Sequence, residues 1–203
     1  MTIWNIENPT TETYKKLKDN ILGQFFPWSW NENTITTAWE STDFVNDELV
    51  GHVDYLDSDI GQHEDFGFYS HGFLMRPVKN TDVTCCYPTP TSPFTENAHD
   101  LVTEILDFNQ IKYDLIFRMA ANCVHTTEHR RYSPLHEDHP WAHTNLLIYL
   151  TDTYNGDTMI ENKKKNEYEQ YFGREDEAIL FRGVHCHRPP ALSRRIVFIA
   201  TFI

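Results

Sequence analysis

The sequence predicts a mainly β fold of the α+β type, in which helices precede an antiparallel sandwich or barrel. Two observations lead to this fold class. From residue 113 onward the chain consists of short strand-like runs separated by turn residues, with no helical pattern between them. Before residue 113, two segments have the apolar spacing of amphipathic helices. Short strands at close spacing without intervening helices are typical of antiparallel rather than parallel sheets.

The helices are predicted from spacing and capping residues. Residues 10–22 (TTETYKKLKDNIL) begin with threonines suited to an N-cap and then carry apolar residues at helical intervals. Residues 96–110 have a one-sided apolar face formed by Ala98, Leu101, Val102, Ile105 and Leu106. We therefore expect a helical or irregular part over about 1–112 and a β core over about 113–203, within a single domain that spans residues 1–203.

The strands are predicted from alternation and from β-branched and aromatic content. Residues 66–74 (FGFYSHGFL) alternate as a strand does, and five runs follow later in the chain: YDLIFRMAANCV, HTNLLIYLTD, DTMIEN, DEAILFRGV and RRIVFIATFI. Residues 25–37 are aromatic and β-prone but broken by Pro27. The segments 39–65, 79–95 and 161–176 are interpreted as loops, and we expect such loops to select the substrate.

Composition excludes several classes of protein. The 203 residues are 40% hydrophobic and 14% aromatic, enough to bury a core, so global disorder is excluded. A net charge of −13 argues against non-specific nucleic-acid binding, which needs cationic side chains. No run approaches the roughly 18–20 apolar residues of a membrane span, and the N-terminus lacks a secretory pattern. We expect a cytoplasmic protein with reduced thiols and no membrane or nucleic-acid partner.

Three features of the β region suggest metal chemistry. His136 and Asp138 are two residues apart, so on a strand they would face the same point. His185 and His187 follow some fifty residues later, at the end of the expected strand AILFRGV, and Arg195 opens the final strand. Two imidazoles and one carboxylate on one face of an octahedral metal leave open positions, as in non-haem Fe(II) oxygenases.

The second histidine ligand is a choice between two residues. His185 and His187 share a strand face, so geometry permits either one. Arg195 follows them by ten and eight positions, which is compatible with both.

The order of these motifs resembles the prolyl-hydroxylase-like 2-oxoglutarate/Fe(II) dioxygenases, especially the small versions from marine viruses and bacteria. The matching segments cover roughly residues 113–203 and occur in the order of the family: RMAAN (118–122), HED (136–138), LLIYL (146–150), GDTMI (156–160), FRGVHCH (181–187) and the terminal strand from Arg195. Glu177 stands near a position where the family usually has glycine, a departure that affects a turn rather than the metal site.

The resemblance implies a double-stranded β-helix, or jelly roll, flanked by N-terminal helices. It assigns metal ligation to His136, Asp138 and His187, since the second histidine of the family lies six residues after the aromatic that corresponds to Phe181. It also assigns 2-oxoglutarate binding to Arg195, with Tyr149 as its partner at the distal carboxylate. The implied activity is hydroxylation with Fe(II), 2-oxoglutarate and O₂, releasing succinate and CO₂. The substrate could be a small molecule or a residue of a peptide or protein, proline included, and neither its identity nor the oligomeric state is readable from the sequence.

Two other functions are compatible with some of these residues. A zinc-dependent hydrolase or structural zinc site could use His136, Asp138, His139, His143 and His187, although it has no need for Arg195 or the GDT turn. A non-catalytic jelly-roll binding module is the second alternative. Arg118 and Asn122 are expected inside the barrel, either near a substrate or bonded to buried carbonyls. His139 and His143 are expected at the site entrance or bonded to loop carbonyls.

Overall fold

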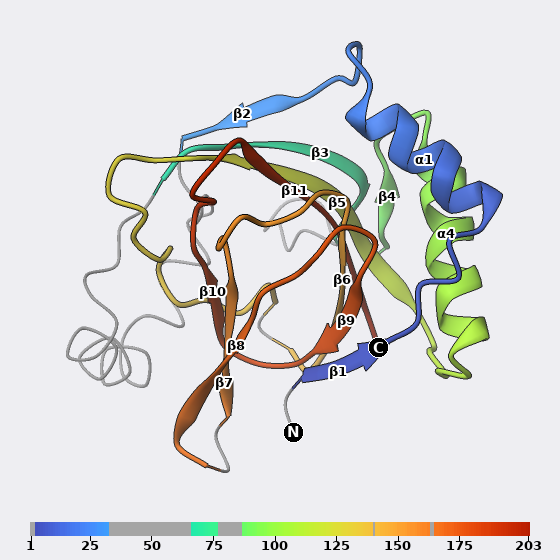
Figure 1. Ribbon diagram of the computed structural model, residues 1–203. Coiled ribbons are helices and arrows are strands. Elements are labelled where there is room, and N and C mark those ends of the chain that lie inside the picture. The colour runs from blue at the N-terminus through green and yellow to red at the C-terminus, as the bar shows by residue number, and fades with distance from the viewer. Residues whose placement is uncertain (1–2, 33–65, 77–86, 140, 163–164) are drawn as a thin grey trace, which may run out of the picture.

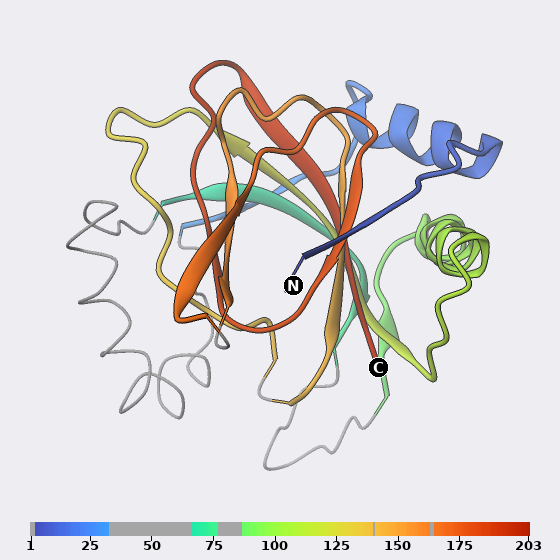
Figure 2. The same ribbon diagram turned by 60° about the horizontal axis from the view of Figure 1, so that its bottom comes forward.

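A computed structural model describes residues 3–32, 66–76, 87–139, 141–162 and 165–203. In this part of the chain, strands curve around a common interior, and two helices lie together on one side of them (Figures 1 and 2). The mainly β fold class is therefore confirmed. The predicted loop 39–65, and residues 79–86 of the loop 79–95, lie outside the described residues.

Two antiparallel sheets make up the described β structure. The large sheet has the order β1-β9-β6-β11-β5-β3-β2, with β4 also paired to β3. Its strands are β1 (Ile3–Ile6), β2 (Ser29–Asn31), β3 (Phe68–Met75), β4 (Thr89–Pro90), β5 (Ile116–His125), β6 (Thr144–Tyr149), β9 (Ala178–Phe181) and β11 (Arg194–Phe202). The small sheet has the order β10-β7-β8, with β7 (Thr158–Asn162), β8 (Glu167–Tyr171) and β10 (His185–His187).

The two helices cover the outer face of the large sheet. Helix α1 (Glu12–Leu22) begins where the Thr11 hydroxyl accepts a hydrogen bond from the Tyr14 amide at 3.2 Å, as the capping pattern predicted. Helix α4 (Thr95–Phe108) presents the apolar face expected from the sequence, and all five residues of that face are buried.

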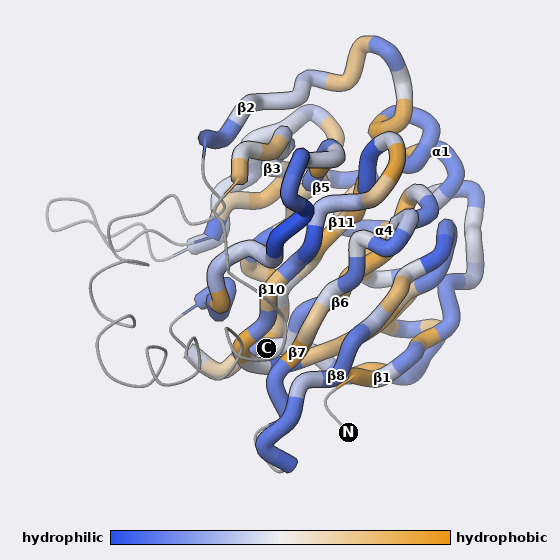
Figure 3. Tube along the Cα trace, turned by 60° about the vertical axis from the view of Figure 1, so that its left-hand side comes forward, coloured by the Kyte–Doolittle hydropathy of each residue, from blue (hydrophilic) through white to orange (hydrophobic). Residues whose placement is uncertain are grey.

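Alternation along the central strands builds two apolar layers. On β11, Ile196 and Phe198 pack with the helices, whereas Val197 and Ile199 pack into the interior together with Ile160 of the small sheet. Hydrophobic stretches along β6 and β11 are visible in Figure 3. Full burial of one such side chain contributes about 1.5–3 kcal/mol, so these layers hold both sheets in place around the interior.

Two local expectations were wrong. The strand AILFRGV ends at Phe181, because the chain turns at Gly183 (φ 91°) and continues as β10 in the other sheet. The segments 161–176 and 79–95 are not loops throughout, since β8 pairs with β7 in the first and β4 pairs with β3 in the second. The short strands β8 and β10 were not recognised as separate strands because they contain mostly polar residues, and pairing with β7 rather than apolar content makes them strands.

Within the described part of the chain, neither helix is long and apolar enough to cross a membrane.

Candidate active site

His136 and His185 are brought together by backbone pairing. The two residues form an isolated antiparallel bridge, in which each amide donates to the carbonyl of the other at 3.0 and 2.9 Å. The sequence analysis assumed that His136 lies on a regular strand, and this was wrong. The isolated bridge nevertheless places His136 beside β10. Direct opposition across a bridge brings side chains close together, and the centroids of the two rings are 4.4 Å apart.

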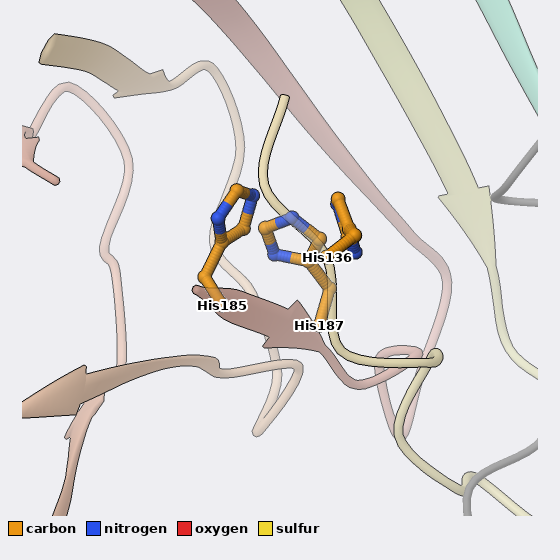
Figure 4. A group of neighbouring side chains, drawn as sticks. All are labelled: His136, His185 and His187. Carbon is orange, nitrogen blue, oxygen red and sulfur yellow. The ribbon is translucent and has the colours of Figure 1, made fainter. Parts of the chain in front are cut away.

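Three imidazoles converge at this point. His136, His185 and His187 each offer a nitrogen, and these nitrogens all lie within 4.8 Å of one another. Figure 4 shows the three rings side by side, two of them projecting from β10. The grouping is close enough for a single metal ion to contact more than one of them.

Asp138 adds a carboxylate to this cluster. Its Oδ2 lies 3.5 Å from the His185 Nε2, and its Oδ1 accepts a hydrogen bond from the Arg118 Nη1 at 2.6 Å. Burial opposes ionisation of this carboxyl, but the Arg118 guanidinium and the neighbouring imidazoles hold the pKa of Asp138 well below its usual range. Arg76 donates from Nη1 to the Asp138 carbonyl oxygen at 2.6 Å, which fixes the backbone at the same residue.

In the two bridged histidines, His136 and His185, the hydrogen bond at Nδ1 leaves Nε2 with an unprotonated lone pair. The Nδ1 of His136 lies 2.9 Å from the Pro134 carbonyl oxygen, and that of His185 lies 3.1 Å from the Gly183 carbonyl oxygen. A carbonyl only accepts, so Nδ1 carries the proton and Nε2 is free to bind a metal. Burial lowers the pKa of His185 to about 3, which keeps the ring neutral at physiological pH.

The buried atoms Asp138 Oδ2 and His185 Nε2 have no hydrogen-bond partner among the described residues. Two acceptors that face each other at 3.5 Å repel unless a positive charge or a proton lies near both. This donor set, one carboxylate oxygen and neutral imidazole nitrogens, fits a divalent transition metal such as Fe(II).

A second polar group lies next to the imidazoles. Arg195 is buried, with 2% of its surface exposed, and its Nη2 donates to the Thr158 Oγ1 at 2.9 Å. The same hydroxyl lies 3.1 Å from the Tyr149 hydroxyl, and the guanidinium carbon lies 5.7 Å from the centre of the Tyr149 ring. Burial raises the pKa of Tyr149, so the phenol is neutral. The family resemblance implied that Arg195 and Tyr149 bind the same carboxylate, and the structure links these two residues through the Thr158 hydroxyl. Thr158 was not singled out from the sequence, although it belongs to the GDT motif.

Arg195 has no salt bridge to any carboxylate among the described residues, and its Nε has no hydrogen-bond partner. Burial lowers the pKa of this guanidinium because it disfavours the charged form. A buried cation without an anion is costly, so the surroundings of Arg195 favour the binding of a carboxylate.

Four other residues were singled out from the sequence, and the structure places them outside the cluster of three imidazoles. Arg118 pairs with Asp138 rather than with a buried carbonyl, and the buried Asn122 Oδ1 has no hydrogen-bond partner in the part of the chain that the structure describes. His139 and His143 pack edge to face at 4.8 Å, and the His139 Nε2 contacts the Thr201 hydroxyl at 2.9 Å. Neither belongs to the group of three imidazoles.

Comparison with known proteins identifies the fold. No protein-family model and no curated protein sequence matches this chain. Among solved structures, it is similar to a 2OG-Fe(II) oxygenase family oxidoreductase from Burkholderia pseudomallei (TM-score 0.55, 13% identity, 75% of this chain and 78% of that one). It is also similar to the non-heme alpha ketoglutarate dependent epimerase SnoN from nogalamycin biosynthesis (TM-score 0.54, 8% identity, 100% of this chain and 78% of that one).

The chain thus has the jelly-roll fold of the 2-oxoglutarate/Fe(II) oxygenases, and the resemblance noted in the sequence is confirmed at the level of the fold. At these identities the likeness is one of architecture, and the activity has to be argued from the site.

Proposed function

We propose that this protein is a 2-oxoglutarate- and Fe(II)-dependent dioxygenase that hydroxylates a small molecule or a peptidyl residue such as proline. One observation carries the proposal: a cluster of metal-type donors lies next to a buried guanidinium that no described carboxylate neutralises. A 2-oxo dicarboxylic acid would satisfy both, because one end can chelate a metal while the other end binds a guanidinium through two parallel hydrogen bonds.

For the metal ligands we propose His136, Asp138 and His185. The sequence spacing favoured His187 as the second histidine, and three contacts support His185 instead. His185 is bridged directly to His136, its Nε2 faces Asp138 Oδ2, and its Nδ1 proton is oriented by a carbonyl. The Nδ1 of His187 lies instead against Arg195 and Thr158, at 3.4 and 3.3 Å.

For the co-substrate we propose the pocket formed by Arg195, Thr158 and Tyr149. When bound, Fe(II) supplies the activation of O₂ and the oxidation of 2-oxoglutarate to succinate and CO₂ that accompanies substrate hydroxylation. The chain itself contributes charge and orientation. Arg195 binds the distal carboxylate, Thr158 and Tyr149 hold the guanidinium in place, and Arg118 holds Asp138 through one oxygen so that the other faces the metal.

The direct test measures succinate released from 2-oxoglutarate by the purified protein with Fe(II) and O₂, with and without a panel of amino acids, peptides and metabolites. We expect slow succinate release without added substrate and faster release with the correct one. The same assay with Zn(II) in place of Fe(II) should give none. A protein that neither binds 2-oxoglutarate nor releases succinate under these conditions would overturn the proposal, and hydrolytic activity with Zn(II) would support the hydrolase alternative.

A further inference from the structure

His187 stands between the two halves of the site. Its ring centroid lies 5.7 Å from that of His136 and 5.1 Å from that of His185, on the metal side. On the other side its Nδ1 contacts Thr158 and Arg195. A ligand that reaches from the metal donors to Arg195 therefore passes along this ring.

The position of His187 follows from strand pairing. His187 lies opposite Thr158 in the β10–β7 register, and the side chains of such a pair point to the same face of the sheet. His185 is two residues earlier on β10 and lies opposite Ile160. The strand thus directs one imidazole toward the metal donors and the next toward the guanidinium, while the buried Cys186 belongs to the apolar cluster of Tyr132 and Leu135.

We propose that His187 is a binding residue for the distal carboxylate of the 2-oxo acid and not a metal ligand. This inference rests on the proposed function. The carboxylate that pairs with Arg195 would also accept a hydrogen bond from the Nδ1–H of His187, so that an imidazole joins Arg195 and the Thr158 and Tyr149 hydroxyls in recognising one group.

A neutral ring can fill this role in both states of the pocket. The guanidinium of Arg195 only donates, so in the free protein the His187 Nδ1 accepts from it. A bound carboxylate replaces Nδ1 as the acceptor for Arg195, and the tautomer protonated at Nδ1 then donates to the same carboxylate.

This arrangement makes a prediction about selectivity. A 2-oxo acid without the distal carboxylate, such as pyruvate, retains the metal-chelating end but offers nothing to Arg195 or His187. His187 should therefore contribute to the affinity for 2-oxoglutarate and not to the affinity for pyruvate. A residue that merely supported the fold would affect both acids alike.

The experiment titrates Mn(II) and then either 2-oxo acid into the wild-type protein and into His187→Ala, His187→Gln and His185→Ala, using calorimetry. For His187→Ala we expect Mn(II) affinity within about threefold of wild type and 2-oxoglutarate affinity reduced roughly tenfold, the effect of one hydrogen bond to a charged group. Pyruvate affinity should not change. His187→Gln, which retains an N–H donor, should recover part of the loss, and His185→Ala should lose Mn(II) binding.

Three results would overturn the inference: loss of Mn(II) binding in His187→Ala, an equal loss of affinity for both acids, or an unchanged affinity for 2-oxoglutarate. The first would instead make His187 the metal ligand that the sequence spacing favoured. If the wild-type protein binds Mn(II) but not 2-oxoglutarate, the proposed function fails, and that outcome is recognised before any variant is compared.

Discussion

The two ends of the site balance charge in opposite ways. At the metal end the charged residue is Asp138, which already has a cationic partner in Arg118, and the imidazoles around it offer nitrogen lone pairs. At the other end the charged residue is Arg195, and its described partners are neutral hydroxyls and a neutral imidazole. One end is therefore suited to a cation and the other to an anion, and the difference shows why a chelating dicarboxylate fits the space between them.

The ends also differ in how the fold supports them. Arg195 and Tyr149 lie on neighbouring strands of the large sheet, which is backed by two helices and the larger apolar cluster. His185 and His187 lie on a three-residue strand of the small sheet, whose own apolar cluster is smaller. We expect the anion end to tolerate substitution with little loss of fold, and the metal end to depend more on local contacts.

The largest expected effect is at the metal end, in Asp138→Ala. Removing the carboxylate deletes one of three proposed ligands and leaves Arg118 without its partner, so stoichiometric Mn(II) binding should be abolished. Binding of 2-oxoglutarate should also weaken, because chelation to the metal is lost. Calorimetry with Mn(II) measures this, and Asp100→Ala on the exposed side of α4 is the matched control. Unchanged Mn(II) affinity in Asp138→Ala would remove Asp138 from the ligand set.

The next effect concerns Arg118→Met, which removes the ion pair with Asp138 and leaves all three proposed metal ligands unchanged in the sequence. Loss of the cation leaves Asp138 charged and buried, and we expect the metal-free protein to lose roughly 2–4 kcal/mol of unfolding free energy, since this pair is only partly exposed. Mn(II) should restore most of it, because the metal replaces the missing positive charge. Urea unfolding with and without Mn(II) measures both values, and an equal loss in the two conditions would contradict this role.

At the anion end, Arg195→Lys retains the charge but loses the planar pair of donors. Affinity for 2-oxoglutarate should fall by about 1–3 kcal/mol, or roughly 10- to 100-fold, and Arg195→Ala should weaken it further. Mn(II) affinity should stay the same in both, since the guanidinium has no contact with the proposed metal ligands His136, Asp138 and His185. The neighbouring Arg194→Ala is the control because its side chain is exposed. Retained binding in Arg195→Ala would place the carboxylate elsewhere.

Much of this site could be predicted from the sequence, and the remainder depended on pairing between distant strands. The residues His136, Asp138 and Arg195 were recognisable because spacing and order along the chain are local properties. The choice between His185 and His187 was not, since both share one strand face. What separates them is the bridge to His136, a contact between segments almost fifty residues apart. The Arg118–Asp138 ion pair was equally inaccessible, because it depends on how β5 approaches the HED segment.

The last expected effect is a pH dependence of stability at the metal end, which is measured on the wild-type protein. Burial lowers the pKa of His185 to about 3 and that of His139 to about 2, whereas both should titrate near 6.5 in the unfolded chain. Below pH 6.5 the unfolded chain therefore binds protons that the folded protein does not, and stability is lost as the pH falls. The expected slope between pH 6 and 5 approaches about 1.4 kcal/mol per pH unit for each histidine in the metal-free protein.

Urea unfolding at pH 7, 6 and 5, with a chelator present, measures that slope. The pKa of His187 is also lowered well below its ordinary value, so His139→Asn should remove one of three contributions and reduce the slope by about a third. The window lies above the range in which carboxylates titrate, so Asp138 does not contribute to it. The anion end provides the contrast: Arg195→Lys should have the wild-type slope, because lysine keeps the positive charge that, together with burial, lowers the pKa of His187. A slope that His139→Asn leaves unchanged would show that His139 takes up a proton in the folded protein.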